Sequence, residues 1–210
     1  MPAVIVHAVT QGSAEWGALR AGIPTSSEFH RILTPTGKAS TSAEGYLHGL
    51  LAERMLGRPL QEHITLWMQR GTALEADAVQ YYELQADCDT ERVGFLTTDD
   101  GRIGASPDRL VGAEGLLEIK VPREAVHVGY LLKKPVSMEY YPQIQGQLWV
   151  SGRAWVDVLS FHPELPPALI RVERDEPYIA QLAAAVTTFS DYLERTAAEL
   201  EERGWIKPRA

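Results

Sequence analysis

Apolar residues in the first third of the chain recur with the period of an α-helix. A helix is predicted over 41–57, because Thr41 and Glu44 match a capping box and Gly57 suits a helix end. Its apolar positions are Tyr46, Leu47, Leu50, Leu51 and Met55. Two more helices are predicted, one over 25–33, opened by a box from Thr25 to Glu28, and one over 71–84.

From Val93 the pattern changes to short apolar runs separated by turns. Strands are predicted between 93 and 122, with turns at Asp100-Gly101 and Glu114-Gly115. A helix after Pro142, strands over 154–162 and 168–175, and a long helix from near Pro177 to Gly204 follow. This order predicts a mixed α/β (α+β) fold, with a central mixed sheet flanked by helices. No linker interrupts the chain, so 1–210 is expected to form one domain.

Composition narrows the function classes. The net charge of −8 argues against binding nucleic acid through a generally basic surface, although it leaves room for a local basic channel. No apolar run approaches the ~18 residues of a membrane span. The N-terminus lacks a basic region before its apolar run and is interpreted as a strand. The single cysteine, Cys88, excludes an internal disulfide framework, and a cytoplasmic location is expected.

Three ionisable residues are expected to meet on one face of a β-hairpin. Glu118 and Lys120 share a strand face, and the turn near Glu114 brings Asp108 opposite Glu118. Two adjacent carboxylates repel, and a hard divalent cation such as Mg²⁺ or Mn²⁺ removes that cost. A metal ion and a lysine that holds or deprotonates a water are suited to phosphodiester hydrolysis. The alternative is a surface hairpin with an ordinary Glu–Lys pair.

The spacing S-P-D, nine residues, then E-I-K resembles the P-D…(D/E)-x-K arrangement of restriction-endonuclease-like nucleases. Four further segments resemble the phage lambda exonuclease (YqaJ-type viral recombinase) family, in that family's order. They are "WGALRAGIPTSSEFHRIL", "RGTALEADAVQYY", "YYPQIQGQLWVSG" and "IRVERDEPYIAQL". The first departs at Ser26, where the family commonly has alanine. The resemblance covers most of the chain and implies a restriction-endonuclease-like core.

The resemblance also implies roles at the reaction centre. Asp108, Glu118 and the Ile119 backbone carbonyl would be metal ligands, and Lys120 would orient or deprotonate the attacking water. Glu75 matches a helix-borne acid near a second metal position, so two Mg²⁺ ions are expected, with Mn²⁺ as a substitute. For Glu75 the alternative is a capping box with Thr72. Gln143 matches a glutamine at the scissile region, and Tyr140 matches a tyrosine one turn earlier; ordinary helix surface and core is the alternative for both.

Other residues match positions that contact DNA. Arg20 matches an arginine that holds the 5′-phosphate, with Ser27 and Ser106 in the same pocket; a guanidinium fork suits phosphate. A solvated arginine and a helix-capping serine are the alternatives. Trp67 and Met68 fall where the family places an apolar wedge at the DNA end, and core packing explains them equally well.

The family resemblance implies a Mg²⁺-dependent 5′-to-3′ exonuclease of phage or prophage origin, acting on double-stranded DNA ends that carry a 5′-phosphate. It would release mononucleotides and pass a 3′ single strand to an annealing protein for recombination. A ring-shaped homotrimer is expected, with basic residues lining its channel. Two alternatives stay open: a structure-selective or site-specific endonuclease with the same core, and a non-catalytic DNA-binding subunit.

Overall fold

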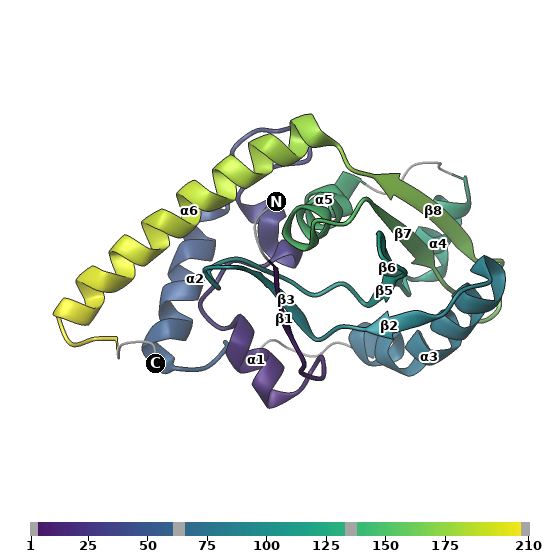
Figure 1. The fold of residues 1–210 in the computed structure, drawn as a ribbon, viewed down its shortest axis with the longest axis horizontal. Helices are drawn as coiled ribbons and strands as arrows, with labels where there is room; N and C mark the ends of the chain where they lie inside the picture. Colours follow the sequence, from purple (N-terminus) through teal and green to yellow (C-terminus); the bar gives the residue numbers. More distant parts are fainter. Residues whose placement is uncertain (1–3, 61–65, 133–137, 207–210) are drawn as a thin grey trace.

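The computed structural model describes residues 4–60, 66–132 and 138–206 (Figure 1). The first half contains β1 (Val4–His7), α1 (Ala14–Arg20), the 3-10 helix η1 (Ser26–Arg31), α2 (Ala43–Leu56), α3 (Leu66–Ala86), β2 (Thr90–Arg92), β3 (Phe95–Thr98) and β4 (Gly104–Ala105). The second half contains β5 (Arg109–Val111), β6 (Gly115–Lys120), α4 (Glu124–Leu132), the 3-10 helix η2 (Met138–Tyr140), α5 (Tyr141–Ser151), β7 (Trp155–Ser160), β8 (Ala168–Glu173) and α6 (Glu176–Glu202).

The larger sheet has five strands in the order β2-β5-β6-β7-β8. Only β6 and β7 pair in parallel within it, and the other pairs are antiparallel, so the sheet is mixed. A second sheet of three antiparallel strands has the order β1-β3-β4. The expected mixed α/β fold is therefore confirmed.

Helices cover both faces of the five-stranded sheet. On one face, Leu116 and Val158 pack with Ile144 and Leu148 of α5. On the opposite face, Leu117 and Leu159 pack with Ala78 and Tyr82 of α3, among others. Figure 1 shows the long α6 running from the end of β8 to lie beside α2, and both helices enclose the largest apolar cluster together with η1 and β3. No helix in the described part of the chain is long and apolar enough to cross a membrane.

Several local predictions need correction. Thr25 and Ser42 precede η1 and α2, and neither makes a side-chain capping hydrogen bond. The first segment is a 3-10 helix, and the Thr25 hydroxyl contacts Arg20 and Ser27 instead of closing a capping box. The second box is wrong because the N-cap of α2 is Ser42, so Thr41 lies one residue before the capping position.

Two helices differ more substantially from the sequence pattern. Helix α3 begins at Leu66 rather than near position 71, which places Thr72 and Glu75 inside the helix and rules out their capping box. Helix α4 was not predicted. Its segment follows Pro122 and exposes Val126, Val128 and Leu132, so its apolar residues do not mark one buried face.

Helix α5 lies very close to η1. A Cβ built on Gly146 would lie 2.5 Å from a ring carbon of Phe29, so glycine is needed for the two helices to pack this closely. Pro142 in the first turn of α5 fits the predicted helix start. This packing fixes α5 between η1 and the five-stranded sheet.

Candidate active site

The hairpin of β5 and β6 places the two acids of the predicted cluster side by side. Arg109 pairs with Leu117, so the preceding Asp108 lies opposite Glu118. The Ile119 N–H donates a hydrogen bond of 2.6 Å to Asp108 Oδ2, which fixes that carboxyl at the hairpin edge. Gly112, with φ of +50°, lies in the connecting turn, slightly earlier than the predicted Glu114-Gly115.

Strand alternation separates the charged residues from the α3 core. Leu117 is fully buried against α3, and Glu118 faces α5 with an exposed fraction of 5%. Ile119 packs partly against the α3 side, as predicted. Its N–H points toward Asp108, and since the N–H and C=O of one strand residue point to the same side, its carbonyl does too.

Three donors surround the Glu118 carboxylate. Lys120 Nζ and Gln143 Nε2 each lie 2.7 Å from Oε1, and Gln147 Nε2 lies 2.7 Å from Oε2. Gln143 Oε1 also accepts a hydrogen bond of 3.3 Å from Lys120 Nζ. The structure therefore brings together Asp108, Glu118, Lys120 and Gln143 as the sequence predicts, with Gln147 as an addition.

Tyr140 joins the cluster, whereas its neighbour Tyr141 does not. The ammonium group of Lys120 lies 4.3 Å from the centroid of the Tyr140 ring, a favourable cation–π arrangement. Tyr141 instead donates a hydrogen bond to Asp175 at the start of α6. Of the two adjacent tyrosines, Tyr140 is therefore the one that lies beside Lys120.

The two carboxyl groups of the cluster repel each other, and an additional positive charge would relieve this repulsion. Burial, and next the charge of Glu118, raise the pKa of Asp108 well above its usual range, even though the Ile119 N–H and Lys120 oppose this. Burial lowers the pKa of Lys120, but the charge and hydrogen bond of Glu118, together with Asp108 and Tyr140, oppose it, and the net pKa is raised. Lys120 is therefore a protonated donor in this arrangement, and it does not offset the carboxyl pair completely.

The donor set fits a hard divalent cation. Two carboxylates and a main-chain carbonyl are oxygen ligands of the kind that Mg²⁺ and Mn²⁺ prefer, and a cation would relieve the repulsion that raises the pKa of Asp108. No group of three or more His, Cys, Asp or Glu side chains suited to a metal occurs within the described ranges. A site here would thus use two carboxylates, with other ligands coming from the backbone and water.

Glu75 is paired with an arginine at the side of the cluster. Its Oε1 forms an ion pair of 2.9 Å with Arg109 Nη1, and the buried Arg109 also donates to the Asp108 carbonyl. Glu75 is close enough to contribute a small upward effect on the pKa of Asp108. The structure therefore places Glu75 beside the cluster, engaged with arginine.

The predicted phosphate-binding residues converge. Arg20 Nη1 donates to Ser106 Oγ at 3.2 Å, and its Nη2 lies 3.4 Å from Ser27 Oγ and 3.5 Å from Thr25 Oγ1. The guanidinium also lies 4.2 Å from the Trp16 ring centroid, which holds it against α1. These contacts give Arg20 a fixed orientation.

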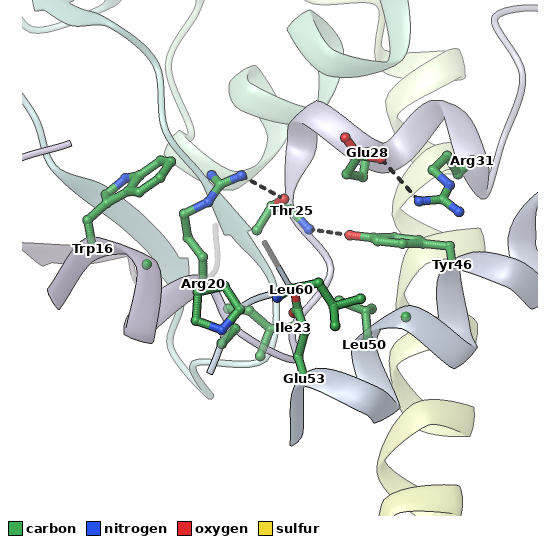
Figure 2. Close-up of a pocket in the computed structure, with 14 residues that line it drawn as sticks. Trp16, Arg20, Ile23, Thr25, Glu28, Arg31, Tyr46, Leu50, Glu53 and Leu60 are labelled. Atoms are coloured by element: carbon green, nitrogen blue, oxygen red, sulfur yellow. Dashed lines mark hydrogen bonds and ion pairs between the residues drawn. The ribbon is translucent and has the colours of Figure 1, made fainter. Parts of the chain in front are cut away.

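Arg20 borders a cavity of about 390 Å³. Figure 2 shows Arg20 and Trp16 on one side and Tyr46 and Arg31 on the other, with Thr25 between them. The Tyr46 hydroxyl accepts from the Thr25 N–H at 3.1 Å, and Arg31 pairs with Glu28 at 3.5 Å. Two guanidinium groups thus border one opening.

A single tripeptide joins the two parts of the site. Ser106 contacts Arg20, and Asp108 contacts Ile119. Between them, the Pro107 carbonyl accepts a hydrogen bond of 2.8 Å from Gln11 Nε2, which also donates to Val93 at 2.9 Å. The Cα atoms of Ser106 and Asp108 can be at most about 7 Å apart. The arginine pocket and the carboxylate cluster are therefore joined by a short stretch of backbone.

Sequence reasoning missed several of these residues. Gln147 is not singled out by any motif, although its spacing of four from Gln143 places both on one helix face. Thr25 was assigned only to a helix cap. For Gln11 we find no sequence signal, because its contacts depend on a loop. The side chains of Trp67 and Met68 lie outside the described residues, so the predicted apolar wedge stays a prediction.

Comparisons with known proteins identify the family of the chain. The model of the YqaJ-like viral recombinase domain matches residues 15–154. An alkaline exonuclease, LHK-Exo from Laribacter hongkongensis, is 31% identical, with a TM-score of 0.82, covering 91% of this chain and 98% of its own. Its complex with dAMP gives 32% identity and a TM-score of 0.81, with the same coverage.

A phage related exonuclease from Haemophilus somnus 129PT is 15% identical, with a TM-score of 0.65, covering 85% of this chain and 96% of its own, and supports the fold alone. No curated protein matches the chain significantly. The family model spans more than half of the sequence and includes Arg20, Asp108, Glu118, Lys120 and Gln143. The chain therefore belongs to the YqaJ-like viral recombinase domain family.

Proposed function

We propose that this protein is a Mg²⁺-dependent exonuclease that degrades one strand of double-stranded DNA from its 5′ end. The observation that carries the proposal is the Ser106–Pro107–Asp108 segment, which connects the arginine pocket to the carboxylate cluster. Family membership and likeness to an alkaline exonuclease, which was also solved with dAMP, support a nuclease acting on DNA.

The carboxylate cluster is assigned to the hydrolytic step. Asp108, Glu118 and the Ile119 carbonyl would hold the divalent ion, which when bound polarises a phosphate oxygen and lowers the pKa of water. Lys120 would orient or deprotonate the attacking water, and its raised pKa in the arrangement seen here favours the orienting role. Gln143 and the Tyr140 ring hold the lysine in place from the α5 side.

The arginine pocket is assigned to the terminal 5′-phosphate. The Arg20 guanidinium offers planar, paired donors, and the Ser27 and Ser106 hydroxyls add further donors at its edge. The short connection from Ser106 to Asp108 limits the distance between the terminal phosphate and the hydrolysed bond. Release of mononucleotides is what the family resemblance implies, and a short distance between the two parts of the site is compatible with it.

The wider role follows from the family resemblance. The enzyme would leave a 3′ single strand for a phage single-strand annealing protein, in a bacterial cytoplasm. Glu75 would take part at a second metal position once released from Arg109, giving two ions in each site. A homotrimeric ring would enclose the duplex, with basic residues facing the channel despite the net charge of −8.

The deciding experiment compares DNA ends. Linear duplexes with a 5′-phosphate or a 5′-hydroxyl, each labelled on one strand, are incubated with the protein and Mg²⁺ beside closed circular DNA. We expect mononucleotides to be released from the 5′ end of the labelled strand, and the release to be faster when that end carries a phosphate. The closed circular DNA should stay intact. Cutting of the circle would instead identify an endonuclease, and inactivity on every substrate would favour a non-catalytic DNA-binding subunit.

A further inference from the structure

Gln147 is buried directly behind the Glu118 carboxylate. It lies on α5, its exposed fraction is 0%, and its Nε2 donates to Glu118 Oε2 at 2.7 Å. The other two donors, Lys120 and Gln143, both contact Oε1, and both are only partly buried. The two oxygens of Glu118 therefore differ: Oε2 is held from inside the protein, and Oε1 faces the open part of the cluster.

The neighbouring Gln145 shows that burial of a glutamine on α5 does not by itself imply this role. Gln145 is also fully buried, but its amide bonds to the backbone of Glu173 and Asp175 near the start of α6. Both atoms of its amide group are thereby satisfied. Gln145 therefore connects α5 to the backbone, whereas Gln147 contacts an ionisable side chain.

The amide oxygen of Gln147, unlike that of Gln145, is not satisfied by a hydrogen bond in the described part of the chain. This oxygen, Oε1, is buried. An unpaired buried carbonyl costs about 1–3 kcal/mol. Methionine would fill a similar volume without that cost. The buried Oε1 of Gln147 therefore costs stability, whereas its Nε2 makes a hydrogen bond to Glu118.

We propose that Gln147 is a positioning residue that fixes the Glu118 carboxylate so that Oε1 is presented to the divalent cation. This inference rests on the proposed function, because it assumes that Glu118 is a metal ligand. Groups that orient metal ligands from behind typically change metal affinity by about 10- to 100-fold when they are removed. Because Gln147 is fully buried, it would act through Glu118 and not by touching the substrate.

The test measures Mn²⁺ affinity by calorimetry in the absence of DNA. Gln147→Met is compared with Gln145→Met, a matched change of an equally buried glutamine on the same helix, and with Glu118→Gln. We expect affinity to fall about 10- to 100-fold in Gln147→Met, and to stay within about twofold of wild type in folded Gln145→Met. Thermal unfolding in chelator should show that Gln147→Met is at least as stable as Gln145→Met.

Wild-type Mn²⁺ affinity in Gln147→Met, together with loss of binding in Glu118→Gln, would overturn this inference and leave the proposed function standing. Equal binding by wild type and Glu118→Gln, or no binding by either, would overturn the proposed function and this inference with it.

A measurement on the wild-type protein does not depend on variant folding. On titration with Mg²⁺, the side-chain NH₂ resonances of Gln147 should shift and those of Gln145 should not; unchanged Gln147 resonances in a protein that binds Mg²⁺ would also overturn the inference.

Discussion

At the scale of single residues, Asp108 is buried beside a second carboxyl group, and this arrangement favours its protonated form. Burial and the charge of Glu118 raise its pKa in the folded protein, whereas the unfolded value is about 3.9. The folded state therefore binds a proton more tightly than the unfolded state. Stability of the metal-free protein is lost as pH rises from the unfolded pKa through the raised folded pKa.

Asp108→Asn should remove this loss. Asparagine keeps an oxygen for the Ile119 N–H but carries no charge, so the variant should be more stable than wild type in chelator at ~pH 8, with a smaller difference at ~pH 5. Urea unfolding at both pH values measures this. A constant difference between variant and wild type at the two pH values would show that the Asp108 carboxyl does not titrate abnormally.

Arg20→Lys should weaken the preference for a 5′-phosphate. Lysine keeps the charge but loses the guanidinium fork that contacts Ser106 and Ser27. Loss of one or two charged hydrogen bonds, each about 1.5–3 kcal/mol, corresponds to a fall in kcat/KM of at least about tenfold on phosphorylated duplex. Duplex with a 5′-hydroxyl is the internal control, and an equal fall on both substrates would place Arg20 outside the phosphate pocket.

At the scale of elements, α5 carries Gln143 and Gln147, and its contact with η1 fixes it relative to the arginine pocket. Gly146→Ala should destabilise the protein by about 1–3 kcal/mol, because the added Cβ would lie 2.5 Å from the Phe29 ring. Gly129→Ala on α4 is the matched control: no atom lies within 4 Å of its added Cβ, and it should be neutral or stabilising by up to ~1 kcal/mol.

Thermal unfolding of both glycine variants gives the comparison. If Gly146→Ala unfolds at the wild-type temperature, α5 and η1 are not tightly packed, and the two parts of the site are held together by the Ser106–Asp108 segment alone.

The same elements show what the sequence could predict. Alternation along 115–120 and the glycine-containing turn placed Asp108, Glu118 and Lys120 together correctly, because local geometry determines all three positions. The Thr25 capping box failed because the segment is a 3-10 helix and the Thr25 hydroxyl contacts Arg20 and Ser27. The ion pair of Glu75 with Arg109 depends on how α3 docks against β5, which no local pattern encodes.

At the scale of the whole molecule, the net charge of −8 makes binding to DNA dependent on where the basic groups lie. The homotrimeric ring is a prediction from family resemblance that would place such groups around the duplex. Light scattering should give three times the mass of the chain, and digestion of long duplexes should be processive. A monomer that digests processively would contradict the enclosing ring.

The central claim is that Asp108, Glu118 and Lys120 form a metal-dependent hydrolytic centre. The most direct measurement is mononucleotide release from a 5′-phosphorylated linear duplex, comparing wild type in Mg²⁺, wild type in chelator and Asp108→Ala in Mg²⁺. We predict release in the first reaction only, with the folded state of Asp108→Ala verified by its unfolding transition. Release by folded Asp108→Ala at the wild-type rate, or by wild type in chelator, would contradict this account.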